Sequence, residues 1–195
     1  MAKSTASKRD SSWPKHNIER ALSRLTPWTG IIYRMVSIRF AKPEYLIDGK
    51  GSQLHGGRWN PVGLAAVYGC TSPEVALAET LRHHRYYNMP DGMALPRLLC
   101  AIRVELENVL PLTDSRVRSR LRMTKKSMCT EDWRKTNVNN RCSDTQLIGR
   151  AAHELGLQGL LVPSAASPSG QVLALFPENG AHLRILNEDE FEALK

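Results

Sequence analysis

The sequence has no apolar run that could cross a bilayer, which takes about 20 consecutive apolar residues as a helix. Its beginning, MAKSTASKRD, is basic and polar and lacks the apolar segment of a secretory signal. These two absences lead us to expect neither a membrane span nor a secretory leader. They predict a protein that works in the cytoplasm without contact with a membrane.

Cysteine is scarce, and its spacing offers no metal site. The 4 cysteines, Cys70, Cys100, Cys129 and Cys142, are far apart and form no Cys-x-x-Cys pair. This excludes the usual zinc cluster and makes a disulfide framework improbable. The adjacent histidines His83 and His84 cannot both turn their imidazoles toward one metal, because neighbouring helical residues point in different directions. We expect both histidines at the surface and no metal in the protein.

The common signatures of nucleotide-binding and hydrolytic enzymes are also missing. No Gly-x-Gly-x-x-Gly opens a helix, and Gly56 and Gly57 do not form that fingerprint. No Walker-type loop or Ser-His-Asp order is present. Expected strands and helices follow one another without a regular βαβ repeat, so a doubly wound sheet is disfavoured.

Acidic residues are outnumbered, with 19 Asp and Glu against 27 Lys and Arg and a net charge of +8. Much of the excess lies in residues 116–141, where nine basic residues face only Glu131 and Asp132. We favour a solvated surface segment that draws anionic metabolites or an acidic protein toward a nearby cleft. A nucleic-acid-binding surface is the distant alternative, since Trp133 alone offers an aromatic face for base stacking.

What the chain does contain predicts one compact α+β domain of mixed sheet with flanking helices. Its 195 residues, 42% of them hydrophobic, suffice for a sizeable core. Residues 1–12 are expected to be disordered, 41–63 to form a long loop, and 113–141 give no clear pattern. Helices are predicted at 14–24, followed by Pro27 as the stop, at 72–87, and at 144–155 with Asp144 as the cap. Strands are predicted at 30–36, 64–68, 98–106, 159–163, 172–176 and 182–186.

The stretch 57–63, GRWNPVG, is the most informative part of the sequence. Its Arg58 follows two glycines that allow close approach of a ligand, and a guanidinium can grip a diphosphate through two parallel hydrogen bonds. Tyr68 ends the next apolar run. Glu79 follows on the helix predicted at 72–87, where a carboxylate can stabilise positive charge on a sugar carbon.

Each of these residues also has an ordinary structural interpretation. Arg58 alone would be a surface arginine, and Glu79 would pair with Arg82 or His83 one turn later. Tyr33 and Arg34 are adjacent on a strand, so their side chains should point to opposite faces. On its own, Ser164 would be a serine at a turn, although a hydroxyl there could reach a ligand.

Taken together, these segments resemble the RES family, named for an arginine, a glutamate and a serine. The resemblance covers about residues 30–178, and residues 1–25 lie outside it. We therefore expect an N-terminal extension at 1–25, partly disordered or a short helix, and a catalytic domain at 26–195. The matching text is Tyr33-Arg34, 57–63 with Tyr68, Ala76-x-x-Glu79, Gln146-x-x-Gly149, and VPSA at 162–165.

The resemblance implies a toxin of a toxin–antitoxin pair, with a fold like that of the ADP-ribosyltransferase toxins. Such toxins deplete NAD by phosphorolysis or hydrolysis, and some instead transfer ADP-ribose to a protein. The implied partners are NAD and phosphate, an Xre-like antitoxin that blocks the active-site cleft, and a second copy in a homodimer. Nucleic acid would be contacted only through the antitoxin complex, and NAD would be a substrate with no further cofactor.

The resemblance also implies roles for individual residues. Arg58, Glu79 and Ser164 would be the catalytic residues, and Tyr33, Arg34, Arg58 and Tyr68 would bind NAD. Two positions depart from the family pattern. Ala166 stands where many members have an arginine, and an asparagine common in the family is replaced near Gln171. Either departure would alter how phosphate or the antitoxin is held.

Overall fold

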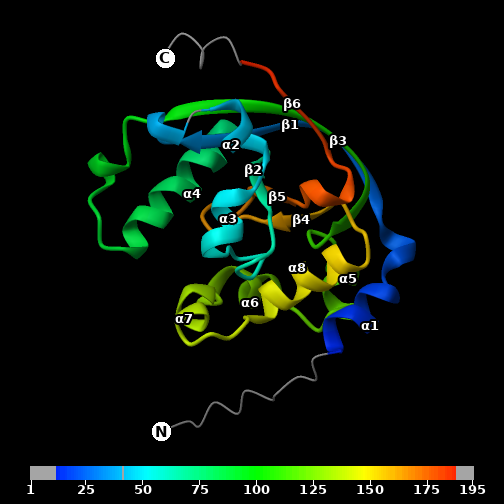
Figure 1. Ribbon diagram of the computed structural model, residues 1–195. Helices are drawn as coiled ribbons and strands as arrows, with labels where there is room; N and C mark the ends of the chain where they lie inside the picture. The colour runs from blue at the N-terminus through cyan, green and yellow to red at the C-terminus, as the bar shows by residue number, and fades with distance from the viewer. Residues whose placement is uncertain (1–11, 41, 188–195) are drawn as a thin grey trace, which may run out of the picture.

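The computed structural model describes residues 12–40 and 42–187 and contains a mixed sheet surrounded by short helices (Figure 1). The strands are β1 (Thr26–Val36), β2 (Val67–Cys70), β3 (Leu98–Pro111), β4 (Gly159–Pro163), β5 (Gln171–Leu175) and β6 (His182–Ile185). The α-helices are α1 (Trp13–Glu19), α2 (Pro43–Ile47), α3 (Lys50–His55), α4 (Pro73–Tyr86), α5 (Ser115–Arg120), α6 (Lys125–Thr130), α7 (Trp133–Val138) and α8 (Asp144–Glu154). Single 3₁₀ turns lie at η1 (Leu22–Arg24), η2 (Ile38–Phe40), η3 (Asp91–Ala94) and η4 (Pro177–Asn179).

The strands form one sheet whose pairing closes on itself. Their order is β1-β2-β5-β4-β3-β6, and β1 also pairs with β3, so five strands make a ring and β6 adds to β3. Only β3 and β4 are parallel. The long β3 makes this arrangement possible, because Ile102–Glu105 pair with β6 while Val109–Pro111 pair with β4. The predicted α+β class with flanking helices is confirmed.

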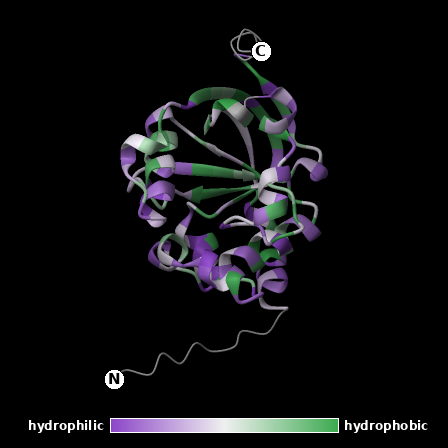
Figure 2. Ribbon diagram, turned by 60° about the vertical axis from the view of Figure 1, so that its left-hand side comes forward, coloured by the Kyte–Doolittle hydropathy of each residue, from purple (hydrophilic) through white to green (hydrophobic). Residues whose placement is uncertain are grey.

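Alternation along the strands divides the core into two clusters. Ile32, Ile102 and Leu173 belong to a cluster built mainly from the sheet. A second cluster lies between the sheet and the helices and includes Ile148 of α8 and Phe176. Figure 2 shows the hydrophobic strands inside a more hydrophilic layer of helices. The core therefore lies between the sheet and the helices that cover it.

The two long helices form where local capping signals predict them. Ser72 caps α4 by accepting a hydrogen bond from the Val75 amide, and Pro73 takes the first helical position. In α8 the N-cap is Ser143 rather than the predicted Asp144. Ser143 and Gln146 form a reciprocal capping box, in which each side chain bonds the other residue's backbone. The cap therefore lies one residue earlier than expected.

Two segments predicted without regular structure contain short helices. The expected loop at 41–63 holds α2 and α3, joined at Gly49, whose φ of 70° permits the sharp turn between them. The unassigned segment 113–141 forms α5, α6 and α7, with side-chain caps from Asp114, Thr124 and Asp132. Helices of five or six residues carry little periodic signal and depend on tertiary packing, so the prediction of a loop was wrong.

Strand boundaries also differ from the expected ones. β1 begins at Thr26 and includes Pro27, which was expected to separate a helix from the strand. An irregularity between Thr26 and Trp28 in the pairing with β3 accommodates this proline, which has no amide hydrogen to donate. β2 begins at Val67 rather than residue 64, because its ladder with β5 starts there.

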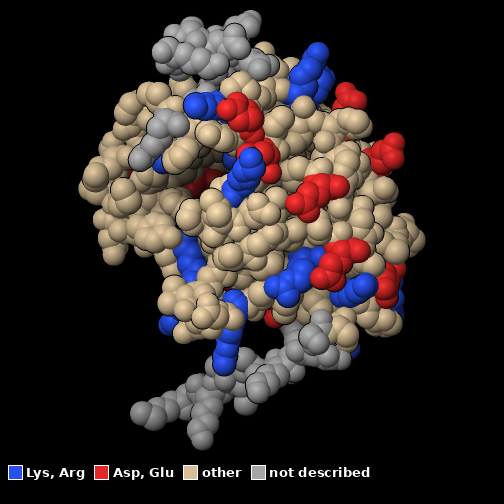
Figure 3. Space-filling view, in the orientation of Figure 1, with Lys and Arg blue, Asp and Glu red and all other residues tan. Residues whose placement is uncertain are grey.

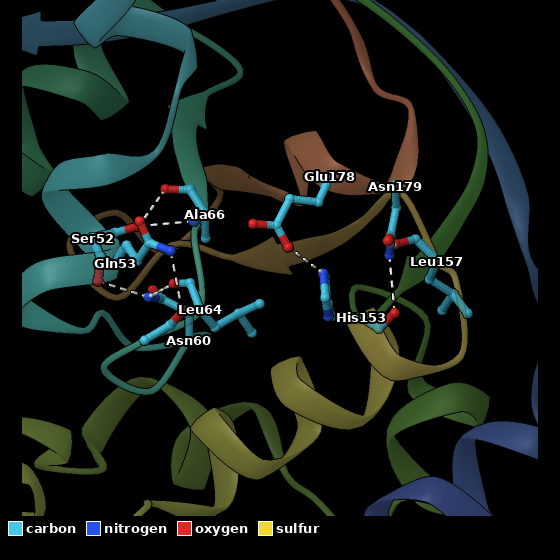
Figure 4. Close-up of polar contacts among 10 residues, drawn as sticks. Ser52, Gln53, Asn60, Leu64, Ala66, His153, Leu157, Glu178 and Asn179 are labelled. Atoms are coloured by element: carbon cyan, nitrogen blue, oxygen red, sulfur yellow. Dashed lines mark hydrogen bonds and ion pairs between the residues drawn. The ribbon is translucent and has the colours of Figure 1, made fainter.

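The expected disorder of residues 1–12 falls almost entirely outside the described residues. The part of the predicted extension that is described packs on the main core, because Ile18 and Ala21 are fully buried in the cluster that contains Ile148. At the other end, the Asn179 amide donates to the carbonyls of His153 and Leu157 and ties η4 to α8 (Figure 4). A domain boundary at 25/26 stays a prediction. Among the described helices, none is long and apolar enough to span a membrane.

Candidate active site

A cavity of about 460 Å³ opens at the sheet between α3, α4 and α7. Figure 3 shows a hollow with acidic atoms in its depth and Lys and Arg side chains at its border. Five of the six predicted site residues line the cavity: Tyr33, Arg34, Arg58, Tyr68 and Glu79. Residues from four separate segments of the chain therefore meet in one place.

Glu79 is held by hydrogen bonds that all reach one carboxylate oxygen. Oε1 accepts from the Ser164 hydroxyl at 2.6 Å and from the amides of Ala165 and Ala166 at 2.9 and 3.2 Å. Among the described residues, Oε2 accepts no hydrogen bond and Glu79 forms no ion pair. The alternative of a surface pair with Arg82 or His83 is therefore not what the structure contains. One oxygen positions the carboxylate, and the other is left for a ligand.

Ser164 lies behind Glu79 rather than in the lining of the cavity. It is 4% exposed, and its hydroxyl oxygen accepts from the amides of Ala166 and Ser167, both at 3.0 Å. The hydroxyl thereby links the turn after β4 to the carboxylate on α4. Ala166 contributes through its backbone amide, a contact that does not depend on the side chain that stands there.

Arg58 is anchored at one nitrogen. Its Nη1 donates to the carbonyls of Met128 and Glu131, at 2.7 and 2.9 Å, and these two hydrogen bonds fix the orientation of the guanidinium. Burial lowers the pKa of Arg58, nearby Arg82 lowers it further, and the Glu79 carboxylate raises it. The charges of Arg58 and Glu79 thus influence each other, although the charged atoms of the two side chains are more than 4.0 Å apart and form no ion pair.

The loop that carries Arg58 is stabilised by Tyr68 and Asn60. The Tyr68 hydroxyl accepts from the Trp59 amide at 2.8 Å and donates to Asn60 Oδ1 at 2.7 Å. Burial raises the pKa of this hydroxyl. The Asn60 amide donates to the carbonyls of Ser52 and Leu64 (Figure 4). Because the Tyr68 hydroxyl is committed to the loop, its ring is the part that can face a ligand.

Helix α8 packs against the loop that carries Arg58. The buried Gln146 amide donates to the Gly57 carbonyl at 3.0 Å. A Cβ atom on Gly149 would lie 1.6 Å from the Trp59 carbonyl oxygen, so only glycine allows this close approach. The sequence motif Gln146-x-x-Gly149 had no assigned role, and the structure gives it one: it seats the loop that presents Arg58.

Tyr33 and Arg34 both border the cavity although they alternate along β1. Tyr33 of β1 pairs with Cys70 of β2, and both Tyr33 and Arg34 are in the lining, so the expectation of opposite faces does not keep either residue from the cavity. Arg34 Nη1 donates to the Leu46 carbonyl. Burial lowers the pKa of the Arg34 guanidinium.

Several lining residues were not found from the sequence. They are Arg82, His83, His84 and Arg97, together with Trp133 and Arg134 from the basic segment. His84 is 5% exposed, with Nδ1 3.0 Å from the Thr80 carbonyl oxygen, so the expectation that both histidines lie at the surface was wrong for it. The basic segment is likewise more than solvated surface, since Trp133 and Arg134 of α7 line the cavity.

One signal could have revealed Arg82. It follows Glu79 by three residues, so the two share a face of α4. No comparable signal marks Arg134, which reaches the cavity only through the packing of α7. Within 12–40 and 42–187, no group of three or more His, Cys, Asp or Glu side chains is arranged to hold a metal ion.

Comparison with known proteins identifies the family. Residues 31–193 match the family model of the RES domain. The chain belongs to the RES domain family. "Toxin Res" of Yersinia enterocolitica is 28% identical over 153 residues, which cover 76% of this chain and 85% of that protein.

Other relatives match over shorter regions. "NAD(+) phosphorylase MbcT" of Mycobacterium tuberculosis is 28% identical over 122 residues, which cover 61% of each chain. "Prs ADP-ribosylating toxin" of Sphingobium sp. is 40% identical over 58 residues, 30% of this chain and 34% of that protein. A chain in the crystal structure of the M. tuberculosis MbcT–MbcA toxin–antitoxin complex has the same fold, with a TM-score of 0.66, 21% identity, and coverage of 93% of this chain and 96% of that one.

Proposed function

We propose that this RES domain protein is the toxin of a toxin–antitoxin pair and depletes NAD by cleaving its nicotinamide–ribose bond. The observation that carries the proposal is the Glu79 carboxylate, positioned through Oε1 and facing the same cavity as Arg58. The names of its relatives, a Res toxin and an NAD(+) phosphorylase, support the same activity.

The cavity suits an anionic dinucleotide. Its volume of about 460 Å³ lies within the range of about 300–1,000 Å³ that is usual for ligand sites. Arg58 has one nitrogen anchored to main-chain carbonyls, which leaves the rest of its guanidinium for the diphosphate, with Arg34 as a second donor. The rings of Tyr33 and Tyr68 supply apolar walls.

Glu79 is the residue that stabilises the reacting centre. Nicotinamide in NAD is a cationic leaving group, so it departs with the electron pair of the broken bond and needs no general acid. Positive charge then grows on the ribose carbon, where the carboxylate stabilises it. Ser164 and the amides of Ala165 and Ala166 position Glu79 for this role. Phosphate or water completes the reaction by bonding to the ribose carbon.

A protein ADP-ribosyltransferase is the second candidate, favoured by the similarity to the Sphingobium toxin. It uses the same bond cleavage with a protein side chain as acceptor. A nucleic-acid-binding module is a distant third, because α7 of the basic segment contributes Trp133 and Arg134 to the wall of the cavity. The same proposal includes an Xre-like antitoxin that blocks this cleft. It also includes a homodimer of the toxin and action in the cytoplasm.

The direct test is to incubate the purified chain with NAD labelled in its adenylate half and to separate the products by chromatography. The proposal predicts release of nicotinamide with ADP-ribose or its 1″-phosphate as the labelled product. Label that stays in intact NAD would contradict it. A parallel incubation with cell lysate separates the second candidate, because protein transfer leaves the label on a polypeptide.

A further inference from the structure

A second group of basic side chains borders the cavity on the side of α4 and α7. Arg82 comes from α4 and Arg134 from α7, with His83 between them. Arg134 Nη2 lies 3.0 Å from His83 Nδ1, and Arg82 Nη2 donates to the Cys129 carbonyl at 3.2 Å. The roles proposed above for Arg58 and Glu79 leave this group without a function.

The charged groups in the described lining of the cavity are mainly basic. Five arginines line it, Arg34, Arg58, Arg82, Arg97 and Arg134, whereas Glu79 is the one acidic residue in the described lining. Among the described residues, neither Arg82 nor Arg134 has a carboxylate within 4.0 Å. A diphosphate neutralises about two positive charges when it binds arginines. With Arg58 and Arg34 assigned to the diphosphate, Arg82 and Arg134 are the lining arginines that can bind a second anion.

The location of Arg82 places that anion beside the reacting centre. Arg82 is three residues after Glu79 on α4, and side chains at this spacing are neighbours on a helix surface. The two groups do not neutralise each other, because Arg82 is turned to the Cys129 carbonyl and Glu79 to the turn after β4. An anion bound by Arg82 would therefore lie next to the sugar carbon that Glu79 stabilises.

Arg134 is held rigidly enough to complete such a site. Its guanidinium stacks over the Trp133 and Tyr86 rings, with its carbon 4.4 and 4.6 Å from their centroids. Its Nε is buried and has no hydrogen-bond partner. Burial, with Arg134 as the second cause, lowers the pKa of His83 to about 4, so the imidazole is neutral at pH 7 and can accept a hydrogen bond from Arg134.

We propose that Arg82 and Arg134 form an anion subsite that binds inorganic phosphate as the acceptor for the ADP-ribosyl group. This inference rests on the proposed function. The C1″–N bond of NAD breaks with its electron pair on nicotinamide, and a lone pair of a phosphate oxygen forms the new C1″–O bond. Hydrogen phosphate and NAD thus give nicotinamide and the 1″-phosphate of ADP-ribose, with the proton of hydrogen phosphate retained or released according to pH. No oxidant or reductant takes part.

The experiment measures initial rates of nicotinamide release across phosphate and NAD concentrations, together with the ratio of ADP-ribose 1″-phosphate to ADP-ribose. Arg82→Gln and Arg134→Gln are compared with the wild type and with Arg116→Gln, which removes the same charge from the exposed side of α5. Arg82→Lys is included because it keeps the charge and loses the planar fork. The rate without phosphate and the KM for NAD report whether each variant is folded.

Each Gln variant is expected to raise the KM for phosphate about tenfold or more, since tenfold corresponds to about 1.4 kcal/mol. The KM for NAD should change less than about threefold, the product ratio should shift toward ADP-ribose, and Arg82→Lys should lie between. A rise in the KM for NAD instead would assign these arginines to the dinucleotide and overturn the inference. A wild-type rate independent of phosphate would overturn it too, while leaving NAD cleavage intact. Absence of any NAD cleavage would refute the proposed function itself.

Discussion

The Ser164 hydroxyl donates a hydrogen bond of 2.6 Å to Oε1 of Glu79, a residue 85 positions earlier in the chain. This contact joins the end of β4 to the second turn of α4. It turns two residues that are unremarkable in the sequence into one unit, in which the serine positions the carboxylate and the carboxylate faces the cavity. The predictions below test this unit and the structure around it.

Glu79→Gln should lower the turnover of NAD by about a hundredfold or more, the usual scale for loss of one group that stabilises transition-state charge. The KM for NAD should change little, because Arg58 and Arg34 bind the diphosphate. Nicotinamide release measured by chromatography checks both values. The matched control is Glu74→Gln, which changes an exposed carboxylate on the same helix and should leave turnover unaltered.

Ser164→Ala should lower turnover by roughly tenfold to a hundredfold, since a charge-assisted hydrogen bond contributes roughly 1.5–3 kcal/mol and about 1.4 kcal/mol corresponds to tenfold in rate. The KM for NAD should hold, because Ser164 does not line the cavity. The free energy of unfolding should also fall by about 1 kcal/mol, the cost of leaving the part-buried Ser167 amide without its acceptor. Urea titration and steady-state kinetics measure the two effects. The exposed Ser169→Ala should change neither, and equal losses in both variants would refute a positioning role.

Gly149→Ala should destabilise the protein by about 3 kcal/mol, because overpacking forces the backbone to shift. The added methyl would lie 1.6 Å from the Trp59 carbonyl oxygen, so the Arg58 loop must move away from α8. Gly51→Ala is the matched control. It also replaces a helical glycine, but a Cβ atom at this position would have no atom within 4 Å. It should stabilise α3 by about 0.5–1 kcal/mol. Thermal unfolding of both variants gives the comparison.

Stability should decrease as the pH falls from about 6.5 to about 4, in part because of His83. Its pKa in the folded protein, about 4, lies below its ordinary value of 6.5, so the unfolded chain takes up the proton first. The contribution of His83 is complete above pH 6.5 and is lost as the pH falls toward 4. It is small, because the side chain is partly exposed. Melting temperatures at several pH values should fall less steeply for His83→Gln than for the wild type, whereas the exposed His182→Gln should follow the wild type.

The parts of the fold that the sequence predicts well are those that local interactions determine. Helix α4 has its cap, its first-turn proline and its apolar face within one segment, and β4 coincides with a short apolar run bounded by glycine and proline. The closed ring of strands could not be predicted, because it depends on β1 pairing with both β2 and β3. Such long-range pairing leaves no periodic mark on the sequence.

The residues of the candidate site likewise fall into those that local sequence indicates and those that only tertiary contacts bring together. The glycines around Arg58 and the helical setting of Glu79 point to a ligand site, but nothing in their spacing indicates that Ser164 would bond Glu79 or that the Tyr68 hydroxyl would be committed to the Trp59 amide. Arg134 and Trp133 enter the cavity because α7, a helix of six residues, packs beside α4. A helix so short has no amphipathic pattern from which to predict the face it presents.

A crystal structure of the Glu79→Gln variant with NAD tests the central claim most directly. The account predicts the diphosphate within hydrogen-bond distance of Arg58 and the nicotinamide ribose beside the carboxamide at position 79. NAD bound elsewhere on the chain, or bound in this cavity with its nicotinamide ribose remote from position 79, would contradict the account.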